Sequence, residues 1–197
     1  MKFLYAGGEC KNHCFANYGG CLVHTPKTTE ILSSEEIAYQ LGLLTSKHEQ
    51  AFVYTPDMFS DLYYKSVFLE LPFYDGGFPG AYIAVNASVR TLIDKVKDFS
   101  DLLDRGIREV WFGIESGDEL MRKKYGKPNF SNSEVAFTTK ELQRFGIHAC
   151  WYLLDSKDDT DSSRLATYEL IRECEPYRIR IWPLEDLEDL SDSETKT

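Results

Sequence analysis

The feature that most constrains the fold is an alternation of short apolar runs with longer amphipathic segments. The apolar runs are rich in aromatic and β-branched residues and lack clean polar alternation, which is typical of strands covered on both faces. Strands that alternate with helices form parallel sheets built from βα units. Six strands are predicted, over residues 3–6, 51–55, 81–87, 109–114, 148–154 and 177–183.

The segments between these strands carry helical patterns and helix-end signals. A capping box, serine followed three residues later by glutamate, precedes the apolar stripes that begin at Ile37 and Val135. Another stripe predicts a helix over 92–103 that ends before Gly106. Glycine follows two of the predicted helices, as is typical of the loop that leads from a helix into the next strand.

The sequence contains neither a Gly-x-Gly-x-x-Gly motif nor a P-loop, so a nucleotide-binding doubly wound sheet is not favoured. We predict an α/β fold, an open partial (βα)6 TIM-type barrel with parallel strands. One core domain is expected over 1–186, followed by an acidic, disordered tail at 187–197.

Composition excludes several classes of protein. The formal net charge is -10, which disfavours nucleic acid or an anionic membrane surface as a partner. No apolar run is long enough for a signal peptide or a membrane span. The chain has 5 cysteines, an odd number that disfavours a disulfide framework. We therefore expect a soluble cytoplasmic protein with no nucleic-acid or membrane partner.

Three cysteines crowd the loop that follows the first predicted strand. They are Cys10, Cys14 and Cys21, with the spacing C-x3-C-x6-C. In a reducing compartment the usual reason to place thiols so close together is a metal. Three thiolates leave a tetrahedral metal one ligand short. Either His24 closes the coordination shell or an exogenous ligand does, and the residues alone leave both possibilities open.

Polar side chains also follow the predicted strands. In (βα) barrels the chemistry gathers at the carboxyl ends of the strands, so these side chains are candidates for a binding site. They are Asp57 after the second strand, Asn86 at the end of the third with Ser88 and Arg90 beyond it, and Glu115 and Ser116 after the fourth.

Two stretches resemble the radical S-adenosylmethionine (SAM) enzymes: the cysteine triplet, and residues 110–121 with the following Tyr125-Gly126-Lys127. Residues 110–127 are similar to the fourth strand and helix of the cobalamin-binding and methylthiotransferase-like branches of that family, and residues 86–92 resemble the end of its third strand. The resemblance implies an open six-unit barrel. It also implies that Cys10, Cys14 and Cys21 bind three irons of a 4Fe-4S cluster, with SAM chelating the fourth iron.

The resemblance implies an activity as well. An electron from the cluster, supplied by a donor such as flavodoxin or ferredoxin, would cleave SAM and give a 5′-deoxyadenosyl radical that abstracts hydrogen from an unknown small-molecule or peptide substrate. Arg90 would pair with the SAM carboxylate. Glu115, with Ser116 beside it, would accept hydrogen bonds from the ribose hydroxyls or the ammonium group. Phe15 or Tyr18 would stack on adenine, and the same rim would be lined by Asp57, Asn86 and Ser88.

Two alternative functions stay open. One is a non-enzymatic zinc protein with a structural or accessory role, using Cys10, Cys14, Cys21 and His24. The other is a degenerate family member that does not cleave SAM. It is suggested by Tyr54-Thr55-Pro56-Asp57, which stands where the family has Gly-Gly-Glu, and by Trp151-Tyr152-Leu153-Leu154-Asp155, which lacks the glycine-spaced motif of the family's fifth strand.

Single residues have structural alternatives too. Asp57 and Glu115 could each cap a following helix. Arg90 could form a salt bridge. Lys123, Lys124 and Lys127 are expected to form a solvated helix end.

Overall fold

The computed structural model describes residues 2–5, 32–45, 50–55, 57–69, 71, 82–127 and 130–184. The cysteine loop and residues 185–197 lie outside the described residues. The domain boundary at 186 and the acidic tail therefore stay predictions.

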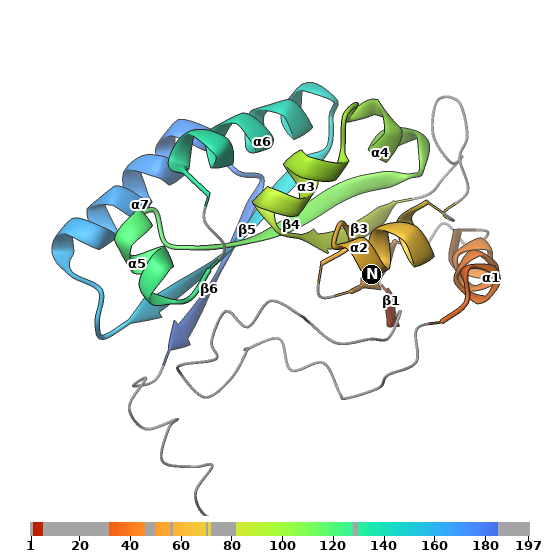
Figure 1. The fold of residues 1–197 in the computed structure, drawn as a ribbon, viewed down its shortest axis with the longest axis horizontal. Coiled ribbons are helices and arrows are strands. Elements are labelled where there is room, and N and C mark those ends of the chain that lie inside the picture. The colour runs from red at the N-terminus through yellow and green to blue at the C-terminus, as the bar shows by residue number, and fades with distance from the viewer. Residues whose placement is uncertain are drawn as a thin grey trace, which may run out of the picture.

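Six parallel strands form one sheet whose spatial order follows the chain from β1 to β6. The strands are β1 (Lys2–Tyr5), β2 (Ala51–Tyr54), β3 (Ile83–Ala87), β4 (Ile107–Glu115), β5 (His148–Ser156) and β6 (Arg178–Leu184). All six predicted strands are present, and their ends lie within two residues of the predicted ones. The sheet curls into a partial barrel, as predicted (Figure 1).

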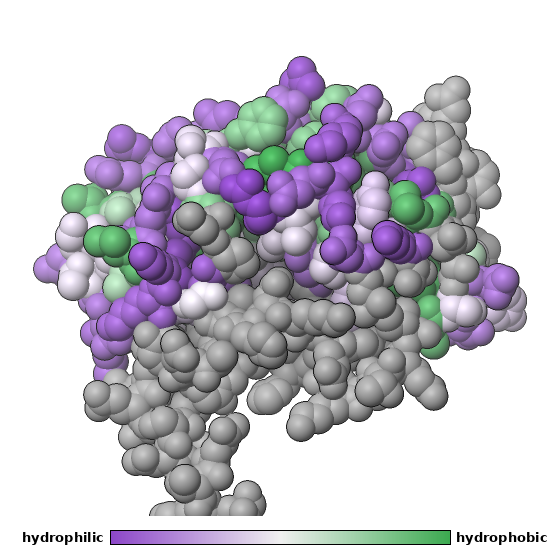
Figure 2. Space-filling view, in the orientation of Figure 1, coloured by the Kyte–Doolittle hydropathy of each residue, from purple (hydrophilic) through white to green (hydrophobic). Residues whose placement is uncertain are grey.

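Helical segments connect the strands, and Figure 1 shows α3, α4, α6 and α7 together on one side of the sheet. The segments are α1 (Ser34–Thr45), α2 (Asp61–Tyr63), the π-helical turn η1 (Tyr64–Phe68), α3 (Val89–Lys95), α4 (Ser100–Asp104), α5 (Glu119–Lys124), α6 (Asn132–Arg144) and α7 (Asp161–Cys174). The outward surface of this layer is largely hydrophilic (Figure 2).

Local signals in the sequence account for several helix ends. The Ser131 side chain accepts a hydrogen bond from the Glu134 backbone N–H at 3.2 Å, and the Glu134 carboxylate accepts one from the Ser131 N–H at 2.8 Å. This is the reciprocal capping box predicted for α6. Gly106 and Gly146 have φ angles of 78° and 73°, the left-handed conformation in which glycine ends a helix without strain.

The single helix predicted over 92–103 was wrong: the segment forms two short helices, α3 and α4. Val96 ends α3 with an extended backbone at φ -88° and ψ 109°. The Asp98 carboxylate then accepts a hydrogen bond from the Ser100 N–H at 2.9 Å, at the start of α4. Asp98 thus offers the backbone a local bond that competes with continued helix.

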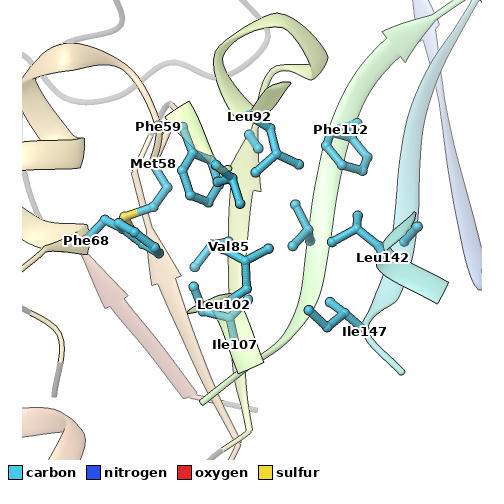
Figure 3. Packing of buried hydrophobic residues seen from close by; sticks show 14 of the residues in the cluster. Met58, Phe59, Phe68, Val85, Leu92, Leu102, Ile107, Phe112, Leu142 and Ile147 are labelled. Carbon is cyan, nitrogen blue, oxygen red and sulfur yellow. The ribbon is translucent and has the colours of Figure 1, made fainter. Parts of the chain in front are cut away.

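The core lies between the sheet and its helices. Buried strand residues such as Val85, Ile107 and Phe112 pack against Leu92 and Leu142 from the helices (Figure 3). Because successive side chains of a strand point to opposite faces, the strand residues that alternate with these core residues point to the other face of the sheet. On this face, called the inner face below, a second buried cluster is formed by Phe52, Ala84, Trp111 and Cys150.

Candidate functional site

The carboxyl ends of β2 and β3 are tied together by hydrogen bonds. The Met58 N–H donates to the Asn86 carbonyl at 2.9 Å, and the Asn86 side-chain amide donates to the Thr55 carbonyl at 3.0 Å. Asn86 is 7% exposed, and the Tyr152 hydroxyl lies 3.5 Å from its amide oxygen. Asn86 therefore links the ends of two neighbouring strands to an inner-face tyrosine of β5.

Asp57 is a buried carboxylate in the turn that follows β2. It accepts hydrogen bonds from the Phe59 N–H at 3.1 Å and from the Thr91 hydroxyl at 2.9 Å. Burial raises the pKa of Asp57, and these hydrogen bonds oppose that effect in part. Asp57 does not cap a helix that begins at Met58, because α2 starts only at Asp61 and has Ser60 as its N-cap. Asp57 instead fixes the turn against α3.

Ser88 is the N-cap of α3. Its hydroxyl accepts a hydrogen bond from the Thr91 N–H at 3.2 Å and lies 2.8 Å from the Thr91 hydroxyl. Since Thr91 also donates to Asp57, the candidate residues of β2 and β3 share one hydrogen-bonded cluster.

Glu115 ends β4 in a backbone conformation that glutamate rarely adopts. Its φ angle is 66°, and the register against β5 shifts between Gly113 and Glu115. A left-handed non-glycine residue costs about 1–3 kcal/mol and persists where the surroundings hold it, often at functional sites. The carboxylate of Glu115 lies 2.6 Å from the Lys127 ammonium, with side chains only 8% and 15% exposed.

The Glu115–Lys127 pair depends on the absence of a side chain at Gly113. A Cβ atom there would lie 2.7 Å from Lys127 Nζ and 2.8 Å from Glu115 Oε1. Lys127 was predicted to belong to a solvated helix end, and that prediction was wrong. The loop after α5 brings the Lys127 ammonium back to the end of β4, where it pairs with Glu115. Glu115 is also not the helix cap, since Asp118 accepts the hydrogen bonds from the Leu120 and Met121 N–H groups.

Ser116 and Gly117 join the end of β4 to α7. Ser116 is 2% exposed; its hydroxyl lies 3.3 Å from the Thr167 hydroxyl and accepts a hydrogen bond from the Asp118 N–H at 3.1 Å. The Gly117 N–H donates to the Thr167 hydroxyl at 2.8 Å. These contacts are structural, because they hold the loop that carries Glu115 in place.

Arg90 is on α3, and its guanidinium pairs with Glu134 of α6 and, at 3.7 Å, with Asp94. The salt-bridge alternative considered for Arg90 is thus present in this structure. Its predicted contact with the SAM carboxylate stays a prediction.

The inner face adds residues that the sequence reasoning missed. Trp111 stacks on Tyr152 at 4.8 Å between ring centroids, and Phe52 lies 6.2 Å from Tyr54. Arg180 of β6 lies over Trp111. The two-residue spacing of Glu109, Trp111, Gly113 and Glu115 along one strand was the available signal, since alternate residues share a face.

Trp111 is held in place by a buried carboxylate. Its indole N–H donates to Glu109 Oε1 at 2.5 Å, and the Tyr82 hydroxyl donates to Glu109 Oε2 at 2.6 Å. The Arg178 guanidinium lies 3.7 Å from the same carboxylate. These donors compensate for the burial of Glu109, which has no exposed surface.

The remaining candidate residues, Cys10, Cys14, Cys21, Phe15 and Tyr18, lie outside the described residues, as does His24. Within the ranges that the structure describes, no group of histidine, cysteine and acidic side chains has the arrangement of a metal site. Cys150 is described, and burial raises the pKa of its thiol to about 12, so it stays protonated near neutral pH.

Comparison with solved structures places the fold. The radical S-adenosylmethionine methyltransferase TsrM from Kitasatospora setae, solved with cobalamin and a [4Fe-4S] cluster bound, matches 93% of this chain with a TM-score of 0.69 and 10% sequence identity. Coproporphyrinogen III oxidase (HemN) from Escherichia coli, a radical SAM enzyme, matches 99% of the chain with a TM-score of 0.62 and 12% identity. The fold is that of the radical SAM enzymes.

The radical SAM fold predicted from the sequence is therefore confirmed. The chain spans 36% of the length of TsrM and 46% of the length of HemN, so it corresponds to a part of each. No protein-family model and no curated protein matches the sequence. Of the helices in the described part of the chain, none has the length and apolar character needed to cross a membrane.

Proposed function

We propose that this chain is the core of a radical SAM enzyme, which binds a 4Fe-4S cluster through Cys10, Cys14 and Cys21 and cleaves SAM. The observation that carries the proposal is the combination of a radical SAM fold with a cysteine triplet in the segment between β1 and α1. Both structural neighbours are radical SAM enzymes. Three thiolates suit an iron–sulfur cluster that keeps one iron open for another ligand.

A 4Fe-4S cluster held by Cys10, Cys14 and Cys21 would supply the electron for reductive cleavage of the C–S bond of SAM. The protein's own task is to bind and orient SAM at the carboxyl ends of the strands. Glu115 would accept hydrogen bonds from the ribose hydroxyls, and its left-handed backbone and its pairing with Lys127 fix the carboxylate before SAM arrives.

Asn86 and Asp57 support this arrangement from the neighbouring strands. The amide of Asn86 already bonds the Thr55 carbonyl, so it positions the β2 turn. Asp57 is engaged by Thr91 and the Phe59 backbone, which suits a positioning residue better than a direct SAM ligand. Ser88, Ser116, Arg90, Phe15 and Tyr18 remain proposed members of the SAM site.

The proposal also covers the electron donor, the cellular compartment and the branch of the radical SAM enzymes. An external one-electron donor such as flavodoxin or ferredoxin would reduce the cluster, and the reaction would take place in the cytoplasm. The likeness to the cobalamin-binding and methylthiotransferase-like branches is also part of the proposal. It is supported by the match to TsrM, whose structure holds cobalamin.

Anaerobic reconstitution with iron and sulfide tests this function. We expect brown protein with broad absorbance at roughly 400 nm that changes when SAM is added. With a chemical reductant, the protein should release 5′-deoxyadenosine. The variant Cys14→Ala should lose both the absorbance and the product. Cys174→Ala is the matched control, because Cys174 is a buried thiol at the end of α7 and should keep both.

Two outcomes would overturn the proposal. Stoichiometric zinc with no iron or sulfide after reconstitution would favour the structural zinc site with His24. A cluster that forms without any release of 5′-deoxyadenosine would indicate a degenerate family member that does not cleave SAM.

A further inference from the structure

Arg180 is a cation on the inner face of β6 with an unusual environment. Its guanidinium carbon lies 5.6 Å from the centre of the Trp111 ring and 5.7 Å from that of Trp182. The side chain is solvent-exposed. In the described part of the chain it forms no ion pair with a carboxylate, whereas Arg178 on the same strand face pairs with Glu109. In a chain with a net charge of -10, carboxylates outnumber basic side chains, so an arginine that pairs with none of them in the described residues is a candidate for binding an anionic ligand.

The ring beneath Arg180 is fixed in place. Trp111 is 6% exposed, is hydrogen-bonded through its indole N–H to Glu109, and is stacked on Tyr152. A guanidinium held over an aromatic ring by a cation–π contact keeps its N–H donors at the edge, where they match the two oxygens of an oxyanion. Arg180 is thus pre-oriented to bind an anion.

Trp182 supplies an apolar surface next to this cation. It is 45% exposed, two residues after Arg180 and on the same face of β6. The contacts also lead toward the proposed SAM site: Arg180 lies over Trp111, Trp111 stacks on Tyr152, and the Tyr152 hydroxyl lies 3.5 Å from Asn86. A ligand held at Arg180 would therefore lie on the same inner face as SAM.

We propose that Arg180 binds an oxyanion, a carboxylate or a phosphate, of the substrate, while Trp182 contacts the apolar part that carries it. The inference rests on the proposed function, since it concerns the substrate of that same site. It assigns the substrate class as an apolar, anionic molecule and makes Arg180 and Trp182 specificity-determining residues.

Calorimetric titration of the reconstituted protein, in the presence of SAM, tests the proposal with three probes. Phenylacetate and phenyl phosphate carry the two anions on an apolar ring, and phenylacetamide is the neutral counterpart of phenylacetate. Because a hydrogen bond to a charged group is worth more than a neutral one, we expect at least one anion to bind roughly tenfold more tightly than the amide. Whichever of phenylacetate and phenyl phosphate binds with the higher affinity indicates whether the substrate carries a carboxylate or a phosphate.

Variants assign the effect to residues. Arg180→Met should reduce the affinity for the anion roughly tenfold, to the level of the amide. The affinity of Arg180→Lys for the anion should lie between those of wild-type protein and Arg180→Met, because lysine keeps the charge but loses the bidentate geometry of the guanidinium. Trp182→Ala should weaken binding of the anions and the amide alike. Arg172→Met is the control: Arg172 is an exposed arginine of α7, and its loss changes the net charge equally.

The proposal would be overturned if no anion bound more tightly than the amide, or if Arg180→Met bound the anion as well as wild-type protein. Failure of the proposed function has a different signature, namely absence of 5′-deoxyadenosine from wild-type protein. The binding measurement does not require SAM to be cleaved, so the two failures can be told apart.

Discussion

Replacing Gly117 by alanine should destabilise the protein strongly, although glycine to alanine is a small change. Gly117 follows β4 and packs directly against the backbone of α7. An added Cβ would lie 2.4 Å from Thr167 Cα and 2.6 Å from the Ala166 carbonyl oxygen. Carbon atoms in contact prefer about 3.5–4.0 Å, so the loop and the helix must separate by about 1 Å. Backbone atoms cannot rotate aside as the end of a long side chain can.

The energetic cost can be built from the contacts. Overpacking of this kind costs about 1–3 kcal/mol. The displacement also stretches two hydrogen bonds: the Gly117 N–H donates to the Thr167 hydroxyl at 2.8 Å, and the Asn132 side chain donates to the Gly117 carbonyl at 2.9 Å. Each is worth about 1 kcal/mol. The free energy of unfolding should therefore fall by about 3–5 kcal/mol.

Urea denaturation followed by circular dichroism measures this loss. With a slope of about 1–3 kcal/mol per molar urea, the midpoint of Gly117→Ala should fall by at least about 1 M. Gly42→Ala is the control, because no atom beyond its chain neighbours and its own helix backbone lies within 4 Å of its Cβ position, and alanine is favoured over glycine by about 1 kcal/mol inside a helix. It should be as stable as wild-type protein or more so. A Gly117→Ala midpoint close to that of wild-type protein would refute the close approach of this loop to α7.

Two further predictions concern the site. Gly113→Ala should leave the free energy of unfolding within about 1 kcal/mol, because the added Cβ meets only the movable ends of Glu115 and Lys127, yet it should weaken SAM binding by roughly tenfold or more by displacing them. Equilibrium dialysis with SAM measures this, and unchanged affinity would contradict a role for the pair. The free energy of unfolding of Asp57→Asn, compared with that of wild-type protein, should increase as the pH is raised from about 4 to about 7. Burial raises the pKa of Asp57, so the protonated carboxyl stabilises the fold and that stability is lost as pH rises through the folded-state pKa, whereas asparagine does not ionise. Urea titrations at both pH values measure the difference, and the opposite trend would show that the hydrogen bonds outweigh burial.

Much of the fold could be predicted because its signals are local. Six apolar runs predicted the strands, and their alternation with helices predicted parallel pairing in chain order. The capping box at Ser131 and the glycine after α6 are decided by hydrogen bonds and dihedral angles within a few residues, and both are present. The single helix predicted over 92–103 failed because one aspartate offered the chain a competing local bond.

The candidate site was predicted only in part. The polar strand ends could be found, because parallel strands bring their carboxyl ends to one edge of the sheet. The partners of those residues could not. Glu115 and Lys127 are separated by a helix and a loop, and Lys127 resembles an ordinary basic residue at a helix end. Arg90 pairs with a residue of another helix, Glu134, which no pattern in the chain indicates.

The sequence by itself determined the strands, the helix caps and the cysteine spacing, because each depends on residues close together in the chain. Only the tertiary structure decided that Trp111, Arg180 and Trp182 share one face of the sheet and that Gly117 contacts α7. The reason is physical: the curl of the sheet and the packing of its helices bring together residues of distant elements, and those contacts depend on the arrangement of the whole chain.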